Sequence, residues 1–350
     1  MPTVFNRRLA LLKDEMHKRR LDSFLVTKGV NVSYVSGFSG HDAVILVTPG
    51  KSFFATDSRY IEEAGDTVKG FEIRQVKRSL YEIIKDIAAK NKLRRLGFES
   101  MDLPYEVACR LKGFVAKGVL VPVKGLAEDL RTVKDAGEIA LIKRSIRLTK
   151  DVFDRTAPFV RPGVSEESVA RKIEIAFLAS GARPGFDPIV AADANSSKPH
   201  AVPTARKISK NSFVMIDIGC MLKKYNSDMT RMITTGKVND RMKKIYEIVR
   251  TAQSMAIDAI RPGEQAAKID AAARGYIQKK GFGRYFGHAL GHGVGMEVHE
   301  KPTISGVSDC LLRPGMVFTV EPAVYIPKFG GIRIEDMVLV TDRGHEILTR

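Results

Sequence analysis

At residues 160–177 the sequence reads VRPGVSEESVARKIEIAF, and 100 residues later, at residues 260–277, it reads IRPGEQAAKIDAAARGYI. In both copies the Arg-Pro-Gly triplet separates two helical patterns, because proline and glycine end one helix and allow the turn before the next. Similarity at a fixed offset is typical of an internal repeat. The repeat predicts two similar half-domains, related by a pseudo-two-fold axis, with a cleft where they meet.

Each pair of helical patterns is followed by a predicted β-hairpin that carries two acidic residues. The hairpins are FVMIDIGCMLKKYNSDMTRMI (213–233), with Asp217 and Asp228, and MVFTVEPAVYIPKFGGIRIEDMVLV (316–340), with Glu321 and Glu335. Two Arg-Pro-Gly turns could resemble each other by chance, but acids at matching places in both hairpins favour a duplication.

The pairing within each hairpin is expected to bring its two acids together. A tight turn at Leu222 and Lys223 would place the acids of the first hairpin directly opposite each other, with Cβ atoms ~5 Å apart. In the second hairpin a loop centred on Lys328 would do the same. Side chains alternate along a strand, so the second hairpin is expected to have one polar and one apolar face. The polar face holds Thr319 and Arg333 beside the two acids, and the apolar face holds Phe318, Val320, Ile332 and Ile334.

Four acidic side chains on strands with an interior pattern need cations near them. Unpaired buried charge is very costly, and neighbouring carboxylates repel each other. Basic side chains could compensate part of this charge, and Arg333 is placed to do so. Two divalent cations would balance all four acids, and a metal pair ~3.5–4 Å apart matches the reach of opposed acids. The alternative is that the acids lie exposed on the hairpin edges, but the pattern favours a dinuclear metal site.

Four of the seven histidines fall in two short segments. His200 lies in NSSKPHAVPT (195–204), and His288, His292 and His299 lie in GFGRYFGHALGHGVGMEVHEKP (281–302). A histidine in a glycine-rich loop is often structural. Here the glycines on either side of His292 let its imidazole approach a site closely, and neutral imidazole is a good ligand for first-row metals. His292 is therefore the predicted metal-binding histidine.

The composition argues against several classes of function. Lysine and arginine number 57 against 40 acidic residues, which gives a net charge of +17. These basic residues are spread along the chain without a zinc-finger or RNA-recognition pattern, so a solvated surface is favoured over nucleic-acid binding. No apolar run reaches the ~18 residues of a membrane span, and the N-terminus lacks the apolar core of a secretory signal. Three cysteines without C-x-x-C spacing fit a reducing compartment, so a cytoplasmic protein with no membrane association is expected.

Residues 1–127 are expected to form a small α/β domain. Strand patterns at 23–27, 43–48 and 52–56 alternate there with helical patterns at 5–20 and 80–92. A charged helix is expected from near Arg131 to about Phe159, where Arg-Pro-Gly ends it. The second domain, which contains the duplication, is then 128–350.

Four segments around the acids and histidines are similar, in order and spacing, to those of a known family. They are IDIGCMLKKYNSDMTR (216–231), GHGVGMEVHE (291–300), PGMVFTVEP (314–322) and GGIRIED (330–336). The chain resembles the pita-bread metallopeptidases, the methionine aminopeptidase and creatinase superfamily, and most of all its proline-specific branch, aminopeptidase P and prolidase. The resemblance extends to the front domain through NVSYVSGFSGHDAVILV (31–47) and FATDSRY (54–60).

This resemblance implies a fold, a site and cofactors. The fold would be an α/β N-terminal domain followed by an α+β pita-bread C-terminal domain with the internal duplication. The five metal ligands of the family fall on Asp217, Asp228, His292, Glu321 and Glu335. Its substrate-contacting histidines fall on His200 and His299, and accessory positions fall on His288 and Arg333. Two divalent ions are implied, with manganese expected and cobalt, zinc or iron as alternatives, in a homodimeric protein.

The activity implied by the resemblance is hydrolysis of the bond before proline in short peptides with proline at the second position. The metals would lower the pKa of the attacking water and stabilise the oxyanion. Glu321 would act as general base and then as general acid, while His200 and His299 donate hydrogen bonds to the tetrahedral intermediate. Proline has no N–H, so a pocket for its ring must replace the usual backbone contact. Phe186 and Tyr225 are candidates for this pocket.

The sequence departs from the family pattern at two places that bear on substrate choice. Ala192 and Asp193 stand where a small residue and glycine are common, in the loop that carries His200. Some dipeptidase relatives have an arginine for the substrate carboxylate where this chain has Thr303, although Arg313 or a front-domain residue could replace it. An Xaa-Pro aminopeptidase is therefore favoured, with an Xaa-Pro dipeptidase (prolidase) as the first alternative and a non-catalytic basic binding protein as the second.

Overall fold

The computed structural model describes residues 3–91, 93–115 and 118–350, and the chain divides into two compact units, Met1–Arg131 and Thr132–Arg350. The boundary expected after residue 127 falls inside helix α6 (Leu126–Arg131). This helix packs on α1 (Val4–Lys18) and α2 (Gly29–Ser36), so it belongs to the first unit. The last residue of the helix expected at 80–92 lies outside the described ranges.

The first unit is built on one six-stranded mixed sheet with the strand order β4-β3-β2-β1-β5-β6. The three strands expected from apolar runs are observed as β1, β2 and β3, and every residue in them is buried. Helices α4 and α5 contribute Ile84 and Leu111 to a core that also contains Leu25 of β1 and Leu96 of β5. The remaining elements are β1 (Ser23–Val26), β2 (Ala43–Val47), β3 (Ser52–Thr56), α3 (Ile61–Thr67), β4 (Glu72–Gln75), α4 (Glu82–Asn91), β5 (Arg95–Glu99), α5 (Tyr105–Lys112) and β6 (Val119–Val123).

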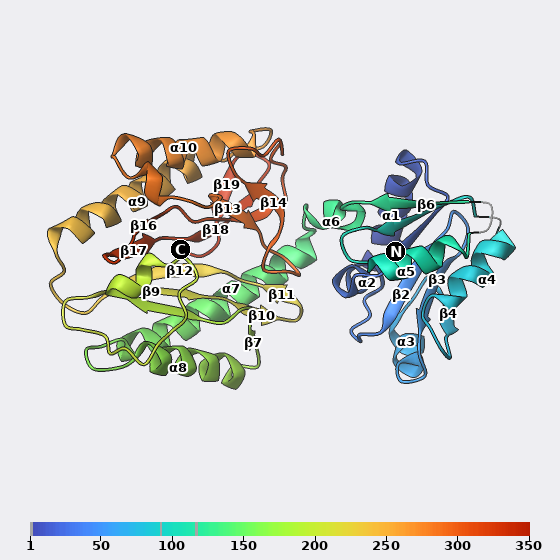
Figure 1. The fold of residues 1–350 in the computed structure, drawn as a ribbon, viewed down its shortest axis with the longest axis horizontal. Helices are drawn as coiled ribbons and strands as arrows, with labels where there is room; N and C mark the ends of the chain where they lie inside the picture. The colour runs from blue at the N-terminus through green and yellow to red at the C-terminus, as the bar shows by residue number, and fades with distance from the viewer. Residues whose placement is uncertain (1–2, 92, 116–117) are drawn as a thin grey trace. The chain divides into compact units, whose positions relative to one another are not determined.

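The second unit consists of two similar halves, each made of a helix pair and a hairpin. The helix pairs are α7 (Ala136–Thr156) with α8 (Glu166–Ala179), and α9 (Asp240–Asp258) with α10 (Ala266–Lys279). The bounds of α8 and α10 differ by 100 residues at both ends, as the repeat predicts. The turn before each of them contains a glycine with positive φ, Gly163 at 88° and Gly263 at 83°. Figure 1 shows the two helix pairs on opposite sides of the strands.

Helix α7 begins later than the sequence pattern indicated. The expected start near Arg131 is wrong, because Asp135 caps the helix with a capping box that includes Glu138. The end expected at about Phe159 is observed as a 3-10 turn, Ala157–Phe159, that follows the last α-helical residue, Thr156.

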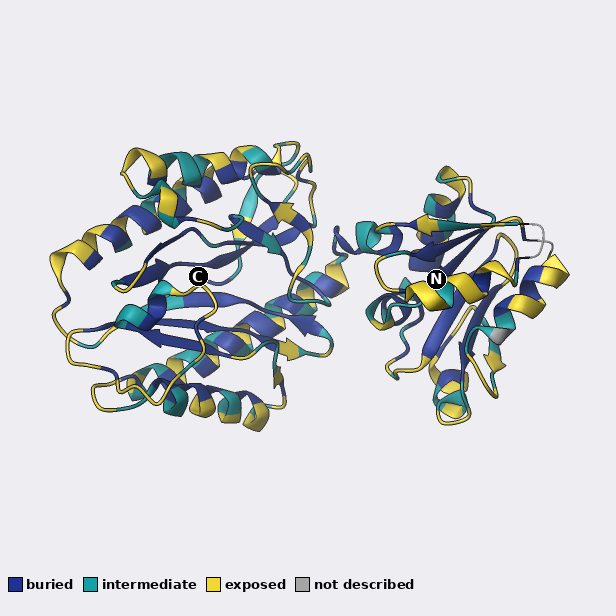
Figure 2. Ribbon diagram, viewed as in Figure 1, coloured by how far each residue is buried: buried dark blue, intermediate teal, exposed yellow. Residues whose placement is uncertain are grey.

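The strands of the second unit lie between the helix pairs and carry the core. Ile173 and Phe177 of α8 pack with Val214 and Ile216 of β9 in one half, and α10 packs in the same way on the other half. Figure 2 shows the buried residues on the helix faces that are turned to the strands. The strands are β7 (Arg183–Pro184), β8 (Ile189–Ala192), β9 (Phe213–Ile218), β10 (Cys220–Leu222), β11 (Tyr225–Asn226), β12 (Met229–Thr234), β13 (Gly291–Gly293), β14 (Glu300–Ile304), β15 (Val317–Val320), β16 (Ala323–Ile326), β17 (Gly330–Arg333), β18 (Asp336–Val340) and β19 (His345–Ile347). Two further 3-10 turns are Asp193–Ser197 and Gly283–Tyr285.

The register expected for the first acidic hairpin is wrong by two residues. Asp217 pairs with Thr230, not with Asp228. The reason is the turn, which lies at Lys223 and Lys224; their φ angles of 49° and 70° are both positive, as a two-residue type I′ turn requires. A shift of two keeps every side chain on its face, so Asp228 remains a diagonal neighbour of Asp217 on the same side.

The register expected for the second hairpin is confirmed. Val317 pairs with Leu339, and Ala323 pairs with Arg333, on either side of the acids. The predicted apolar face, which carries Phe318, Val320, Ile332 and Ile334, is part of the core beneath α9 and α10. The opposite face is therefore the one that can present acids to a cavity.

A buried carboxylate also holds the first unit together. Glu99, at the end of β5, accepts hydrogen bonds from the backbone N–H groups of Thr27 and Lys28 (both 2.7 Å) and from the side-chain amide of Asn31 (2.6 Å). These donors lie at the start of α2, so Glu99 ties that helix to the sheet. Burial raises the pKa of Glu99 to about 7, although the hydrogen bonds act to lower it.

Replacement of Glu99 by glutamine should change how stability depends on pH. A carboxyl whose pKa rises from 4.5 to about 7 on folding binds its proton more tightly in the folded state. Its contribution is therefore fully present below the unfolded pKa and is lost as pH rises through the folded pKa. Between pH 5 and pH 8 the free energy of unfolding of the wild type should fall, relative to Glu99→Gln, by about 2–3 kcal/mol.

Urea unfolding followed by circular dichroism at four pH values would measure this difference. Glu106→Gln, the same change at an exposed residue of α5, is the control and should track the wild type. A wild-type advantage over Glu99→Gln that stays constant from pH 5 to pH 8 would contradict the raised pKa.

Candidate metal centre

The two halves of the second unit enclose a cavity of about 560 Å³. Both acidic hairpins and both histidine segments contribute to its wall. All nine residues predicted as site residues line it: His200, Asp217, Asp228, His288, His292, His299, Glu321, Arg333 and Glu335. His200 and Glu335, the two predicted residues farthest apart at 135 positions, therefore share one space.

The four acids enter the cavity from strands of opposite halves. Asp217 belongs to β9, and Asp228 directly precedes β12. Glu321 directly follows β15, and Glu335 directly precedes β18. The exposed fraction is 8% for Asp217, 4% for Asp228 and 2% for Glu335, so these carboxylates are withdrawn from bulk water. Such burial needs nearby positive charge.

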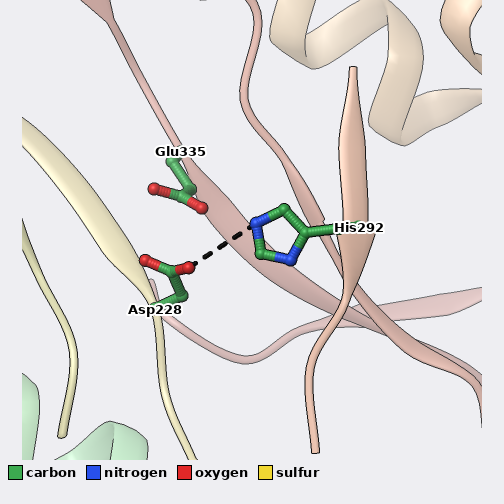
Figure 3. A group of neighbouring side chains, drawn as sticks. All are labelled: Asp228, His292 and Glu335. Carbon is green, nitrogen blue, oxygen red and sulfur yellow. Dashed lines mark ion pairs between the residues drawn. The ribbon is translucent and has the colours of Figure 1, made fainter. Parts of the chain in front are cut away.

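Three side chains form a compact group of potential metal ligands. One ligand atom each of Asp228, His292 and Glu335 lies within 4.8 Å of the others. Figure 3 shows the two carboxylates and the imidazole turned toward one another from separate strands. The Nε2 atom of His292 lies 3.7 Å from Asp228 Oδ2 and 3.3 Å from Glu321 Oε1. One cation could contact all of these atoms with small side-chain movements.

Arg333 is the one arginine among the described residues that line the cavity, and it is fully engaged. Its Nη2 atom donates to Asp217 Oδ2, and its Nη1 atom donates to the hydroxyl of Tyr325 at 2.6 Å and to the carbonyl of Pro199 at 3.0 Å. Its Nε atom donates to Thr230 Oγ1 at 3.0 Å, which in turn donates to Glu335 at 2.6 Å. One guanidinium therefore orients two of the four acids but neutralises one charge.

The pKa values reflect this shortage of positive charge. Burial raises the pKa of Asp228 well above its usual range, and repulsion from Glu335 and Asp217 adds to the rise. Burial, with repulsion from Glu321 and Asp217, raises the pKa of Glu335 in the same way. For Glu321 burial is the largest single effect and acts upward, but the hydrogen bond from His292 and the positive charges of His292, Arg333 and His288 together outweigh it and lower the pKa. A divalent cation among these groups would stabilise their ionised forms.

Two polar atoms at the cavity test whether the residues suit a metal. Asp217 Oδ1 and His288 Nε2 are buried and have no hydrogen-bond partner among the described residues. An unpaired buried polar group costs ~1–3 kcal/mol, so each calls for a ligand. Carboxylate oxygens together with imidazole nitrogen form a donor set that accepts Mn²⁺, Co²⁺, Zn²⁺ or Fe²⁺. The residues present therefore fit divalent cations.

The two glycines beside His292 allow its strand to pack closely against the neighbouring chain segments. The residue lies in β13, between Gly291 and Gly293, opposite Thr303 of β14. A Cβ atom on Gly291 would overlap the carbonyl of Thr319, and one on Gly293 would overlap the carbonyl of Lys301. Only glycine allows the strands to approach so closely, which explains the Gly-His-Gly pattern in physical terms.

The other cavity histidines differ in their surroundings. The ring of His299 lies 4.2 Å from that of His292, and burial together with the charge of His292 lowers the pKa of His299. His288 stacks at an angle near Tyr325, with ring centroids 5.7 Å apart. Burial also lowers the pKa of His288. His200 lies in the more exposed loop after the 3-10 turn Asp193–Ser197.

The Asp193 departure proves compatible with the loop. Asp193 has a φ of 51°, the left-handed conformation that glycine adopts without strain and that aspartate tolerates better than most residues. Its Oδ2 atom accepts a hydrogen bond from Ser212 Oγ at 3.0 Å. An aspartate can therefore stand where the family commonly has glycine, without redirecting the chain.

Sequence reasoning missed some cavity residues and misplaced others. Tyr325, which lines the cavity, and Thr230, which lies behind the lining residues, both bind Arg333 and carried no signal beyond strand alternation. Phe186 lines the cavity, as proposed for the proline pocket, but Tyr225 does not; its hydroxyl donates to Glu138 at 3.1 Å in the core. Arg313 is likewise not among the lining residues.

Comparison with protein families identifies both units. Residues 140–342 match the model of metallopeptidase family M24, and residues 8–133 match the creatinase/prolidase N-terminal domain. An uncharacterized peptidase of Bacillus subtilis (strain 168) is 38% identical over 343 residues, which is 98% of this chain and 97% of that protein. None of the helices in the described ranges has the length and apolar character needed to cross a bilayer.

Two solved structures are similar over nearly the whole chain. A Xaa-Pro dipeptidase from Bacillus anthracis has 36% sequence identity and a TM-score of 0.95, and the match covers 99% of this chain and 98% of that one. An X-Pro aminopeptidase from Thermotoga maritima has 32% identity and a TM-score of 0.88, with 96% and 97% covered. The predicted fold, an α/β unit followed by a duplicated pita-bread unit, is confirmed.

Replacement of Asp228 by asparagine should affect stability in opposite directions with and without metal. In EDTA at pH 8 the variant should unfold at a temperature equal to or above that of the wild type, because it removes a repelled buried charge. With added Mn²⁺ it should unfold at a lower temperature, because a ligand is lost, and its affinity for Mn²⁺ should fall by roughly tenfold or more.

Calorimetric titration and thermal unfolding would measure both effects. Asp187→Asn is the matched control, since Asp187 is an exposed acid at the same cavity but lies outside the ligand group. Wild-type metal affinity in Asp228→Asn would show that Asp228 is not a ligand.

Proposed function

Because the chain belongs to metallopeptidase family M24, we propose that it hydrolyses the peptide bond before proline at the N-terminus of short peptides. The observation that carries the proposal is the convergence of four acids and His292 on one cavity. The activities by which the two similar solved structures are named, Xaa-Pro dipeptidase and X-Pro aminopeptidase, support the choice of proline.

The proposed metal ligands are Asp217, Asp228, His292, Glu321 and Glu335, which hold two divalent cations. When bound, such cations supply Lewis acidity, which lowers the pKa of water and stabilises negative charge on the substrate carbonyl oxygen. Manganese is the proposed metal, since oxygen-rich donor sets with one imidazole accept it readily. We also propose a homodimer, which the family resemblance implies, and a cytoplasmic location, which the three cysteines without C-x-x-C spacing support.

Glu321 is the proposed proton carrier. Its Oε1 atom lies 3.3 Å from His292 Nε2 and accepts a hydrogen bond from Thr319 Oγ1 at 3.1 Å. Its lowered pKa keeps it ionised near neutral pH, which is the form that a general base needs. Glu321 takes a proton from the attacking water and delivers it to the proline nitrogen as the C–N bond breaks.

His299 and His200 are the proposed hydrogen-bond donors to the reacting carbonyl. Both line the cavity. The lowered pKa of His299 favours the neutral imidazole, which can still donate through one ring nitrogen. Donors placed in advance toward the developing oxyanion stabilise the transition state more than the substrate. His288 and Arg333 complete the proposed site, Arg333 by orienting Asp217.

The apolar part of the cavity wall supports a substrate with a proline ring. Phe186, Ile189, Val298 and Pro203 line it beside the acids. A proline ring offers apolar surface and no N–H to be satisfied, so such a wall suits it.

The scarcity of uncommitted basic side chains on the described cavity wall favours aminopeptidase over dipeptidase activity. The described lining residues include no lysine, and their one arginine, Arg333, is engaged with Asp217 and Tyr325. The carboxylate of an Xaa-Pro dipeptide therefore finds no lysine and no uncommitted arginine among the described lining residues, whereas a longer peptide carries its carboxylate farther out. The dipeptidase alternative rests on the names of relatives, among them the Bacillus anthracis structure.

The wild-type enzyme loaded with Mn²⁺ should hydrolyse Ala-Pro-Ala faster than Ala-Pro and should leave Ala-Ala-Ala intact. Asp217→Ala and His292→Ala should each lower kcat by roughly 1,000-fold or more, since each removes a proposed ligand. His17→Ala, a change at an exposed histidine of α1, should retain wild-type rates. Hydrolysis of Ala-Pro alone would establish the dipeptidase, and hydrolysis of neither proline peptide would refute the proposal.

Substitution of Thr303 by arginine tests the choice between the two activities. Thr303 lines the cavity opposite His292, so a guanidinium there could bind a substrate carboxylate. The ratio of kcat/KM for Ala-Pro to that for Ala-Pro-Ala should rise by roughly tenfold. Thr303→Gln, similar in reach but uncharged, should leave the ratio near its wild-type value. An unchanged ratio in Thr303→Arg would mean that the carboxylate lies elsewhere.

A further inference from the structure

The loop that brings His200 into the cavity is held at both ends by one buried side chain outside the cavity. This side chain is Glu166, the first residue of α8, with an exposed fraction of 0%. Its Oε1 atom accepts a hydrogen bond from the backbone N–H of Ala192 at 2.7 Å, before the loop. Its Oε2 atom accepts from the backbone N–H of Thr204 at 3.1 Å and from the Thr204 hydroxyl at 2.7 Å, after the loop.

A third group joins the same carboxylate. The side-chain amide of Asn195 donates to Glu166 Oε2 at 2.9 Å and to the carbonyl of Val202 at 3.2 Å, so it links the two limbs of the loop. Between these anchors lie Pro199, His200 and Ala201, which line the cavity. Glu166 thus fixes the separation of the two limbs, and with it the position of His200.

The surroundings of Glu166 identify it as a dedicated acceptor of hydrogen bonds. No ion pair of Glu166 occurs in the part of the chain that the structure describes, and its four contacts are all with neutral donors. A buried carboxylate without a cation is tenable only when its lone pairs are satisfied in this way. Its polar atoms are therefore committed to the loop and to nothing else that the structure describes.

The inner side of the loop is held by the second half of the unit. The backbone N–H of Gly331 donates to Ser196 Oγ at 2.8 Å, and Arg333 donates to the carbonyl of Pro199 at 3.0 Å. Arg333 also binds Asp217, so the same side chain fixes the position of the loop relative to one of the acids. With Glu166 on one side and β17 on the other, the tip has little freedom to move.

A related arrangement occurs in the other half, four residues farther along the matching helix and with an arginine as intermediary. Asp270 of α10 has an exposed fraction of 1% and accepts from the backbone N–H of Leu290 at 3.2 Å and from Arg274 at 2.7 Å. Arg274 donates to the carbonyls of Phe286 at 2.9 Å and of His288 at 2.8 Å. In each half, an acid of the second helix therefore anchors the loop that carries a cavity histidine.

We propose that Glu166 is a positioning residue that acts on the reaction through the loop 193–203 and its His200. The inference rests on the proposed function, in which His200 contacts the substrate. Misplacement of a substrate-binding group by about 1 Å can lower the rate by roughly 100-fold, so a residue remote from the substrate can have a large effect.

Glu166→Gln is the direct test. The amide NH2 replaces one of the two carboxylate oxygens and cannot accept a hydrogen bond, so at least one donor of the loop loses its acceptor. Hydrogen exchange in residues 192–206 should become faster by roughly tenfold, as local opening becomes easier. Glu167→Gln is the matched control: it makes the same change in the next residue, whose side chain is 43% exposed and pairs with Arg171. Exchange that is equally slow in Glu166→Gln would overturn the anchoring role, and this readout does not depend on which peptides are cleaved.

Kinetics then test the action through His200. Glu166→Gln should lower kcat/KM for Ala-Pro-Ala by roughly tenfold or more, with Mn²⁺ affinity within about twofold of the wild type. In a His200→Ala background the same change should cost less than about twofold, because the group it positions is gone. If the losses of kcat/KM in the two single variants multiply in the double variant, or if Mn²⁺ affinity falls in parallel, the effect is a general structural one and the proposal is overturned.

Thr204→Val provides a milder version if Glu166→Gln does not fold. It removes one of the four donors and leaves the carboxylate and both backbone contacts in place. Its hydrogen exchange in residues 192–206 should be faster, and its kcat/KM for Ala-Pro-Ala lower, than in the Glu167→Gln control, and wild-type exchange and kinetics in this variant would contradict the proposal. If the wild type cleaves no proline peptide, the proposed function fails, whereas the exchange measurement still decides whether Glu166 anchors the loop.

Discussion

Buried negative charge is the constraint on which the second unit depends. Four acids share a cavity with Arg333, the one arginine among its described lining residues, so their formal charge exceeds that of the guanidinium by three. The protein can hold this excess because each acid is fixed by a strand whose other face is apolar core, as in the hairpin with Phe318 and Val338. The excess negative charge in the cavity favours the binding of cations. A divalent cation bound by these groups would relieve the repulsion, and under the proposed function metal binding, stability and activity are linked through the same side chains.

The duplication explains how such a site can be built from ordinary elements. Each half contributes two of the four acids, one pair from each hairpin. Two halves related by a repeat of 100 residues supply one pair each, and the cavity lies where they meet. The histidine loops follow the same plan, since Glu166 anchors one and Asp270 anchors the other. The cavity histidines on these loops thereby gain the rigidity of the helices that hold them.

The two acidic hairpins differ in how far their registers could be predicted from the sequence. In the second hairpin, alternation and a central loop at Lys328 were enough to predict the register and both faces. In the first, the turn lies at Lys223 and Lys224, which have positive φ although neither is glycine or asparagine, so no local signal marked it. The acids still share a face because a shift of two residues preserves the alternation of side chains. The network around Arg333 was not predictable either, because its partners come from three separate strands and a loop.

By itself the sequence determined the repeat, the apolar faces, the glycine pattern at His292 and the list of candidate site residues that the cavity brings together. These features are local, since periodicity and backbone sterics act over a few residues. Only the tertiary structure decided which atoms meet: that Asp217 faces Thr230, that Tyr325 and not Tyr225 borders the cavity, and that Glu166 holds the His200 loop. Such contacts depend on turn geometry and on packing between segments up to 135 residues apart, from His200 to Glu335, and no local pattern encodes them.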